Sequence, residues 1–133
     1  NIIDIVDFHP YFNSDDYNLL VQDFAINLSK LVPGGYKYLW ITETNSGTLA
    51  NSELDQIEVF KQLSWFTDNN WVQKAFWFVI RNGYNNSEGN TYAIYDKDRK
   101  LIKPNLAKEI KKKALSIPFN QRFLDAKYRD PIP

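Results

Sequence analysis

The sequence predicts an α/β fold in which repeated strand–helix units build a parallel sheet. Three apolar segments, at residues 2–8, 36–43 and 72–80, have the length and composition of buried strands. Each is followed by a segment with helical spacing of apolar residues or, before the last helix, by a long polar loop. Consecutive units of this kind favour parallel strands joined by right-handed crossovers.

The first unit begins with the segment "IIDIVDF", residues 2–8. Its odd- and even-numbered positions are both apolar apart from Asp4 and Asp7, which is typical of a strand covered on both faces. Pro10 argues against simple continuation of the strand. Ser14 is the expected N-cap of the helix that follows. The apolar residues of that helix recur at helical spacing: Tyr17, Leu20, Val21, Phe24, Ala25, Leu28 and Leu31.

The next units follow the same pattern. The second strand, residues 36–43, ends in Glu43, and a helix follows in which Leu54, Ile57, Phe60, Leu63 and Phe66 share one side. After the third strand and its polar loop, Pro104 suits the first turn of a third helix. Residues 116–133 contain three prolines and no clear period. We therefore divide the chain into a domain at 1–115 and an extended C-terminal tail at 116–133.

Composition excludes several classes of function. Sixteen basic and sixteen acidic residues cancel, so nothing favours nucleic acid or an anionic membrane surface. There is no cysteine, which excludes disulfides and thiol catalysis. No apolar run approaches the roughly 20 residues of a membrane helix. A single histidine and the lack of a calcium-loop spacing predict no metal site, and no organic cofactor is implied.

Three strand–helix units are few for a complete parallel fold. A TIM barrel needs eight strands and about 250 residues. A partial barrel would expose two strand edges and a bare inner face. Because the chain enters its first strand directly after Asn1, we expect a missing upstream segment or a second chain to complete the sheet.

Chemistry-bearing residues gather where the predicted strands end. In parallel folds the C-terminal ends of strands carry the site, and here they present His9 with Tyr11, then Glu43, then Trp77. Together these residues would make a sugar site. The carboxylate would do the chemistry, His9 and Tyr11 would donate or accept hydrogen bonds, and Trp77 would stack on a pyranose ring.

Strand alternation assigns faces to these residues. It places Leu39, Ile41 and Glu43 on one face of the second strand, and Asp7 with His9 on one face of the first. In the third strand it groups Trp77 with its alternate neighbours: Ala75, Val79 and Arg81.

Each of these residues also has an ordinary structural interpretation. Glu43 is equally compatible with a solvated carboxylate at a strand end, and His9 and Tyr11 with side chains that bond to the backbone. Trp77 is compatible with a core position, as are Trp65 and Trp71 around the end of the second helix.

Four motifs resemble the large clan of retaining glycoside hydrolases with TIM barrels. "LWITETN" is similar to the seventh-strand motif that carries the nucleophile, matched by Glu43, although Asn45 stands where glycine is frequent. "DFHPYF" resembles the sixth strand with His9 and Tyr11, and "AFWFVI" resembles the eighth strand with Trp77. "YAIYDKDRKLIKPNLAKEI" resembles the closing stretch. Among the subgroups of this clan, the sequence most resembles the fungal-type glucanase-like barrels, whose seventh strand reads "WITE".

The resemblance covers residues 2–115 and implies the last three units of a (β/α)8 TIM barrel. It implies a retaining glycoside hydrolase that acts on a β-linked glucan or related polysaccharide, with Glu43 as nucleophile and His9, Tyr11 and Trp77 binding substrate. The acid/base Glu of that clan lies on the fourth strand, which this chain lacks. His9 is a conceivable substitute acid, but an N-terminal half or second chain is the expected source.

Two further functions stay open. A non-catalytic carbohydrate-binding or structural protein built on a partial or degenerate barrel is the main alternative. A nucleotide-binding domain is weaker, because both G-x-G-x-x-G and G-K-[ST] are missing. We expect a secreted or cell-surface protein, in which case Asn85 of "NNS" is the better of two glycosylation sequons.

Overall fold

The chain forms an α/β structure with a parallel sheet, as the sequence predicts. The computed structural model describes residues 5–32, 38–47, 52–78, 80 and 92–116. The strands are β1 (Val6–Asp7), β2 (Tyr11–Phe12), β3 (Leu39–Ser46) and β4 (Lys74–Trp77). The helices are α1 (Ser14–Leu31), α2 (Glu53–Asp68) and α4 (Pro104–Ser116).

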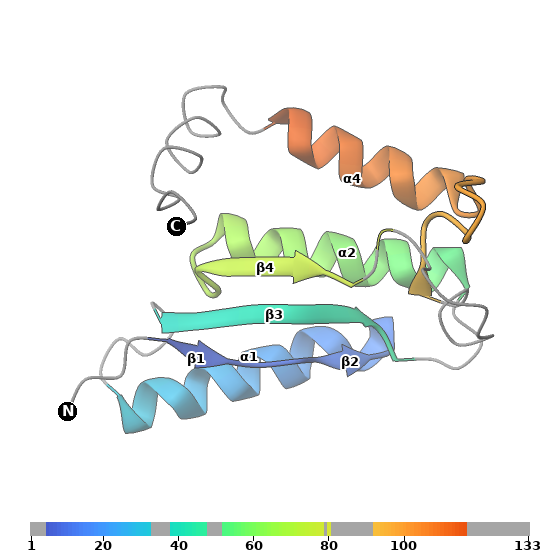
Figure 1. Cartoon of the computed structure of the whole chain (residues 1–133). Helices are drawn as coiled ribbons and strands as arrows, with labels where there is room; N and C mark the ends of the chain where they lie inside the picture. The colour runs from blue at the N-terminus through green and yellow to red at the C-terminus, as the bar shows by residue number, and fades with distance from the viewer. Residues whose placement is uncertain (1–4, 33–37, 48–51, 79, 81–91, 117–133) are drawn as a thin grey trace, which may run out of the picture.

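Strand β3 is the centre of the sheet, and its neighbours all run parallel to it. β1 and β2 are successive pieces of one extended segment and pair with the beginning and the end of β3. β4 pairs with β3 as well, and Figure 1 shows it on the opposite side from β1 and β2. The strand is interrupted around Pro10, as predicted, and pairing with β3 resumes beyond it in β2, a short strand that the sequence does not predict.

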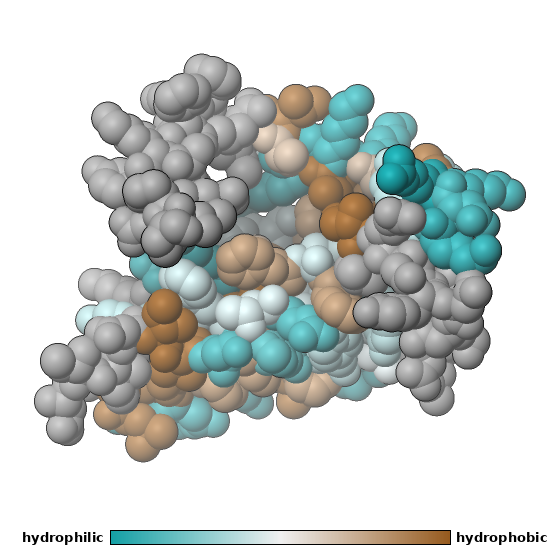
Figure 2. Space-filling model, viewed as in Figure 1, coloured by the Kyte–Doolittle hydropathy of each residue, from teal (hydrophilic) through white to brown (hydrophobic). Residues whose placement is uncertain are grey.

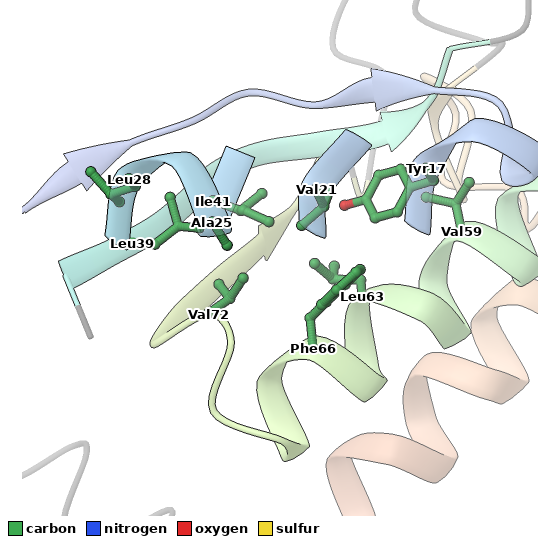
Figure 3. Close-up of a cluster of buried hydrophobic side chains, with 10 residues drawn as sticks. All are labelled: Tyr17, Val21, Ala25, Leu28, Leu39, Ile41, Val59, Leu63, Phe66 and Val72. Atoms are coloured by element: carbon green, nitrogen blue, oxygen red, sulfur yellow. The ribbon is translucent and has the colours of Figure 1, made fainter. Parts of the chain in front are cut away.

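Helices α1 and α2 lie behind the sheet in the view of Figure 1, on one face of it. Their buried side chains meet those of β3 in a single core, shown in Figure 3: Tyr17, Val21, Ala25, Leu28, Leu39, Ile41, Val59, Leu63, Phe66 and Val72. In α1 the buried residues recur at helical spacing. The opposite face of the sheet is not covered by any helix that the structure describes.

The helix ends differ from the predictions by a residue or two. Asn13, not Ser14, caps α1: its side chain accepts a hydrogen bond from the backbone N–H of Asp16. α4 continues through Ser116, the residue at which the predicted tail begins. The rest of that tail, and the loop at 81–91 with its sequon, lie outside the described residues. No described helix combines the length and hydrophobicity that crossing a membrane requires.

Helix α4 packs on α2 through a second, smaller core: Ile57, Ile94 and Leu106, with Phe60, Trp77 and Tyr95 beside them. Glu53 of α2 ties the start of α4 in place, because its carboxylate accepts bonds from the backbone N–H groups of Asn105 and Leu106. Burial raises the pKa of Glu53, but these hydrogen bonds outweigh it and the net shift is downward.

Candidate active site

Strand β3 carries one extra residue beside Glu43. Between Ile41 and Thr44 it advances three residues while β4 advances two, from Ala75 to Trp77. β3 also has one residue more than the first segment. Asp7 pairs with Trp40 and Tyr11 pairs with Asn45, so β3 advances five residues while the first segment advances four. An extra residue in one strand is a β-bulge, which re-aims the side chains around it.

The bulge decides which face Glu43 occupies. Leu39 and Ile41 point into the helix-covered core, with no exposed surface. Simple alternation would send Glu43 there as well, and that prediction is wrong. Instead the Tyr11 hydroxyl donates a hydrogen bond to Oε1 of Glu43. Tyr11 alternates with Asp7 and His9, whereas Val6, Phe8 and Phe12 pack on the core. Glu43 is therefore presented on the uncovered face.

Thr42 occupies the same face and joins it to the first segment. Its hydroxyl donates to Oδ1 of Asp7 at 2.5 Å, and Nε2 of His9 lies 2.7 Å from the same hydroxyl oxygen. Nε2 of His9 is also 3.1 Å from the Asp7 carboxylate. The Thr42 hydrogen bond, with the charge of His9, holds the pKa of Asp7 below its usual range. His9 is thus tied to Asp7 and Thr42 rather than to Glu43.

Tyr11 is a protonated donor to Glu43 throughout the physiological range. Burial and the adjacent carboxylate raise the pKa of its phenol well above the ordinary value of 10.0. Oε1 of Glu43 therefore always receives this bond. The other oxygen, Oε2, has no hydrogen-bond partner among the residues that the structure describes.

Three aromatic rings meet next to Glu43. Tyr11, Phe78 and Tyr92 form what we call the aromatic cluster, with ring centroids 5.7–6.2 Å apart. Phe78 keeps 37% of its surface exposed. Sequence reasoning missed Phe78 and Tyr92, because Phe78 follows the predicted tryptophan and Tyr92 belongs to the next segment of chain.

Trp77 is not part of this cluster. It pairs with Thr44, and its ring stands edge-on against Phe60 of α2 at 5.5 Å. It contacts both hydrophobic cores. The expected meeting of Trp77 with Glu43, His9 and Tyr11 is therefore not observed, and the core position left open by the sequence is the one that Trp77 occupies.

Two clefts lie away from Glu43. One is lined by Ile26, Ser29 and Lys30 of α1 and by Trp71 after α2. The other lies between α2 and α4 beside Trp65. The first is near the beginnings of the strands, and the second lies on the helix layer, so neither shares the uncovered face with the Glu43 carboxylate.

The ends of the parallel strands thus bring together a hydrogen-bonded carboxylate and an aromatic cluster of which Phe78 is exposed. Comparison with known families identifies the class. The model of the glycosyl hydrolase catalytic core family matches residues 2–113, and the chain belongs to this family. It therefore carries a glycoside hydrolase domain. No curated protein matches the sequence.

Proposed function

We propose that this chain supplies the nucleophile of a retaining glycoside hydrolase that acts on a β-linked glucan or related polysaccharide. One observation carries the proposal: the bulge in β3 presents Glu43 on the uncovered face, where Tyr11 holds one carboxylate oxygen. Membership of the glycosyl hydrolase family supports the substrate class.

In this mechanism Oε2 of Glu43 attacks the anomeric carbon of the sugar. The new carbon–oxygen bond forms as the glycosidic bond breaks, and the leaving oxygen takes a proton from a general acid. Water then attacks the anomeric carbon and displaces Glu43, while the conjugate base of the general acid takes the proton from that water, so hydrolysis ends with retained configuration. Tyr11 orients the carboxylate by holding Oε1 and stays bonded to it as its charge is first lost and then restored.

The general acid must come from outside the described residues. Retaining enzymes place their two carboxyl groups about 5–5.5 Å apart, and the acid must be protonated at working pH. Asp7 lies on the right face, but its lowered pKa keeps it ionised. His9 is occupied with Asp7 and Thr42. We propose that an upstream segment or a second chain brings the acid with the remaining units of a (β/α)8 barrel.

Exposed apolar side chains support such a completing partner. On the sheet, Phe76 is 51% exposed. It lies on the uncovered face, which is turned toward the viewer in Figure 2. On α1, Leu20 and Leu31 belong to the apolar pattern but remain 40% and 82% exposed. The apolar stripe of α1 is thus wider than the sheet can cover, as expected for a helix that has another neighbour.

The aromatic cluster supplies the proposed sugar-binding surface. Pyranose rings have apolar C–H faces that pack on aromatic rings, and Phe78 is the exposed member of the cluster. We assign substrate binding to Phe78 and Tyr92, with Tyr11 and His9 as polar contacts. Because a glucan polymer is met outside the cell, we propose a secreted or cell-surface location.

The test compares two charge-neutralising variants of the whole protein. Glu43→Gln is expected to abolish β-glucan hydrolysis while the protein still folds, since an amide is a very poor nucleophile. Glu58→Gln is the control, because Glu58 is an exposed α2 residue paired with Lys61. Hydrolysis by Glu43→Gln at the rate of the control would overturn the proposal.

A non-catalytic carbohydrate-binding protein is the second candidate. The observation that favours it is the engagement of Asp7, whose carboxylate accepts a hydrogen bond from Thr42 and lies 3.1 Å from Nε2 of His9 instead of facing Glu43 as an acid. This candidate predicts glucan binding that depends on Phe78, with no hydrolysis by the wild-type protein. Measurable turnover by the wild type would exclude it.

A further inference from the structure

The residues that follow Glu43 are unusual for the end of a strand because they are polar and fully buried. Thr44, Asn45 and Ser46 have no exposed surface. A buried polar group is costly unless it is hydrogen-bonded, and each of these three side chains bonds to a different part of the fold. Thr44 donates to the carbonyl of Pro10 at 2.7 Å, and Ser46 donates to Asp55 of α2.

Asn45 makes the most connections of the three. Its amide nitrogen donates to the backbone carbonyls of Phe78 and, at 3.3 Å, of Tyr92. Its amide oxygen accepts from Nε2 of Gln56 at 2.7 Å and from the backbone N–H of Ser46 at 2.7 Å. Both hydrogens and both lone pairs of the amide are thereby used, which fixes its orientation.

Gln56 of α2 completes this arrangement from the helix side. It is also fully buried, and its Nε2 reaches the carbonyl of Tyr92 at 3.4 Å in addition to Asn45. The two amides therefore fasten the two chain segments that carry Phe78 and Tyr92 to β3 and α2. Those are two of the three rings in the aromatic cluster around Tyr11.

A strand that slips by one residue turns every later side chain to the other face. The bulge beside Glu43 adds a point at which such a slip is possible. Immediately beyond it, the hydrogen bonds of the Thr44 and Asn45 side chains hold the strand in place. We propose that Asn45 and Gln56 are positioning residues. They fix β3 just after Glu43 and place Phe78 and Tyr92 around Tyr11, so the Tyr11–Glu43 pair keeps the geometry that hydrolysis needs. The catalytic consequence rests on the proposed function, whereas the geometric one does not.

The first test is Gln56→Met, which keeps the side-chain length and removes the amide. The matched control is Gln62→Met on the same helix, where the amide donates to the carbonyl of Ser14 at 2.7 Å and, within the described part of the chain, makes no bond to the segments that carry Phe78 and Tyr92. The readout is the ¹³Cζ NMR resonance of Tyr11, assigned with Tyr11→Phe and followed from about pH 7 to 11 around the phenol's ordinary pKa.

The wild type and Gln62→Met are expected to keep Tyr11 protonated to the top of this range. In Gln56→Met the loosened cluster lets water reach the phenol, and its pKa falls toward the ordinary value of 10.0. A purely structural role would lower the melting temperature of both variants and leave the titration of Tyr11 unchanged in both, which would overturn the proposal. Should Gln56→Met not fold, Gln56→Asn, one methylene shorter, is judged by the same criterion.

Kinetics on β-glucan separate this inference from the proposed function. Gln56→Met is expected to lower kcat by roughly tenfold to a hundredfold, as small misplacements of reacting groups do, with KM changed far less. A shifted Tyr11 titration without hydrolysis by any form, wild type included, would reject the proposed function and leave the geometric inference standing. An unshifted titration in a folded Gln56 variant rejects the inference whatever the activity.

Discussion

The hydroxyl of Tyr11 donates a hydrogen bond to the carboxylate of Glu43 across 32 positions of sequence. The contact depends on the extra residue in β3, which brings Glu43 to the face that Tyr11 already occupies.

Removing the hydrogen bond between Tyr11 and Glu43 tests whether it matters for reactivity. Tyr11→Phe is expected to lower kcat roughly tenfold to a hundredfold, because a hydrogen bond to a charged group contributes about 1.5–3 kcal/mol. Steady-state kinetics measure the loss, and Tyr38→Phe, at a partly exposed tyrosine, is the control. Equal rates for the two variants would contradict the assigned role.

The opposite placements of Trp77 and Phe78 give a paired prediction. Phe78→Ala removes an exposed ring and is expected to weaken glucan binding, measured by calorimetry, with a small change in melting temperature. Trp77→Ala removes a ring packed between two cores and is expected to destabilise the fold by about 3–5 kcal/mol. If Trp77→Leu, the milder change, weakens sugar binding more than Phe78→Ala does, then our placement of the sugar is wrong.

Gly47 is a position where a side chain does not fit. A Cβ atom there would lie 2.1 Å from the backbone oxygen of Tyr11, closer than any real contact. Gly47→Ala must therefore push apart β3 and the segment that carries Tyr11. We expect a lower free energy of unfolding in urea and a smaller fraction of Glu43 bonded to Tyr11, seen as a fall in the pKa of the phenol. Wild-type stability in this variant would argue against the close approach of the two segments.

Lys103 predicts a pH dependence of stability. Burial lowers the pKa of its amine from 10.5 to about 8 in the folded protein, and Glu53 only partly opposes the shift. Between these two values the unfolded chain binds a proton that the folded chain does not. The contribution of Lys103 to the free energy of unfolding therefore rises as pH increases from about 8 to 10.5.

This contribution is measured by urea unfolding at several pH values through that interval. Lys103→Met should lose the rise, whereas Lys108→Met, at an exposed position of α4, should retain it. Parallel pH profiles for the two variants would show that the Lys103 amine keeps its ordinary pKa in the folded protein.

The sequence predicts much of this fold because its signals are local. Apolar patterns find α1, α2 and the segments of β1, β3 and β4, and Pro104 marks the start of α4, whereas β2 is not predicted. The spacing of Tyr17, Val21, Ala25 and Leu28 identifies the buried side of α1. The position of Glu43 at the end of a buried strand is likewise visible, because a carboxylate there breaks an otherwise apolar run.

The face of Glu43 could not be predicted, since alternation assumes an unbroken period of two and a bulge leaves no clear mark in "WITETN". The aromatic cluster was missed for a related reason: Tyr92 reaches Tyr11 only through tertiary packing. Asn45 stands where glycine is frequent in the related motif, but its partner Gln56 is an ordinary helical residue in the sequence. Its role emerges only from burial and from the hydrogen bonds that the two amides share.

Trapping the glycosyl-enzyme tests most directly whether Oε2 of Glu43 is the nucleophile. A 2-deoxy-2-fluoro β-glucoside with a good leaving group slows both steps of a retaining reaction and lets the glycosyl-enzyme accumulate. The whole protein, incubated with this compound and digested, is then analysed by mass spectrometry. We predict one added sugar per chain, carried by Glu43 and lost in Glu43→Gln. A protein that hydrolyses β-glucan yet carries its label on another residue, or turns over with no covalent label, would show that Glu43 is not the nucleophile.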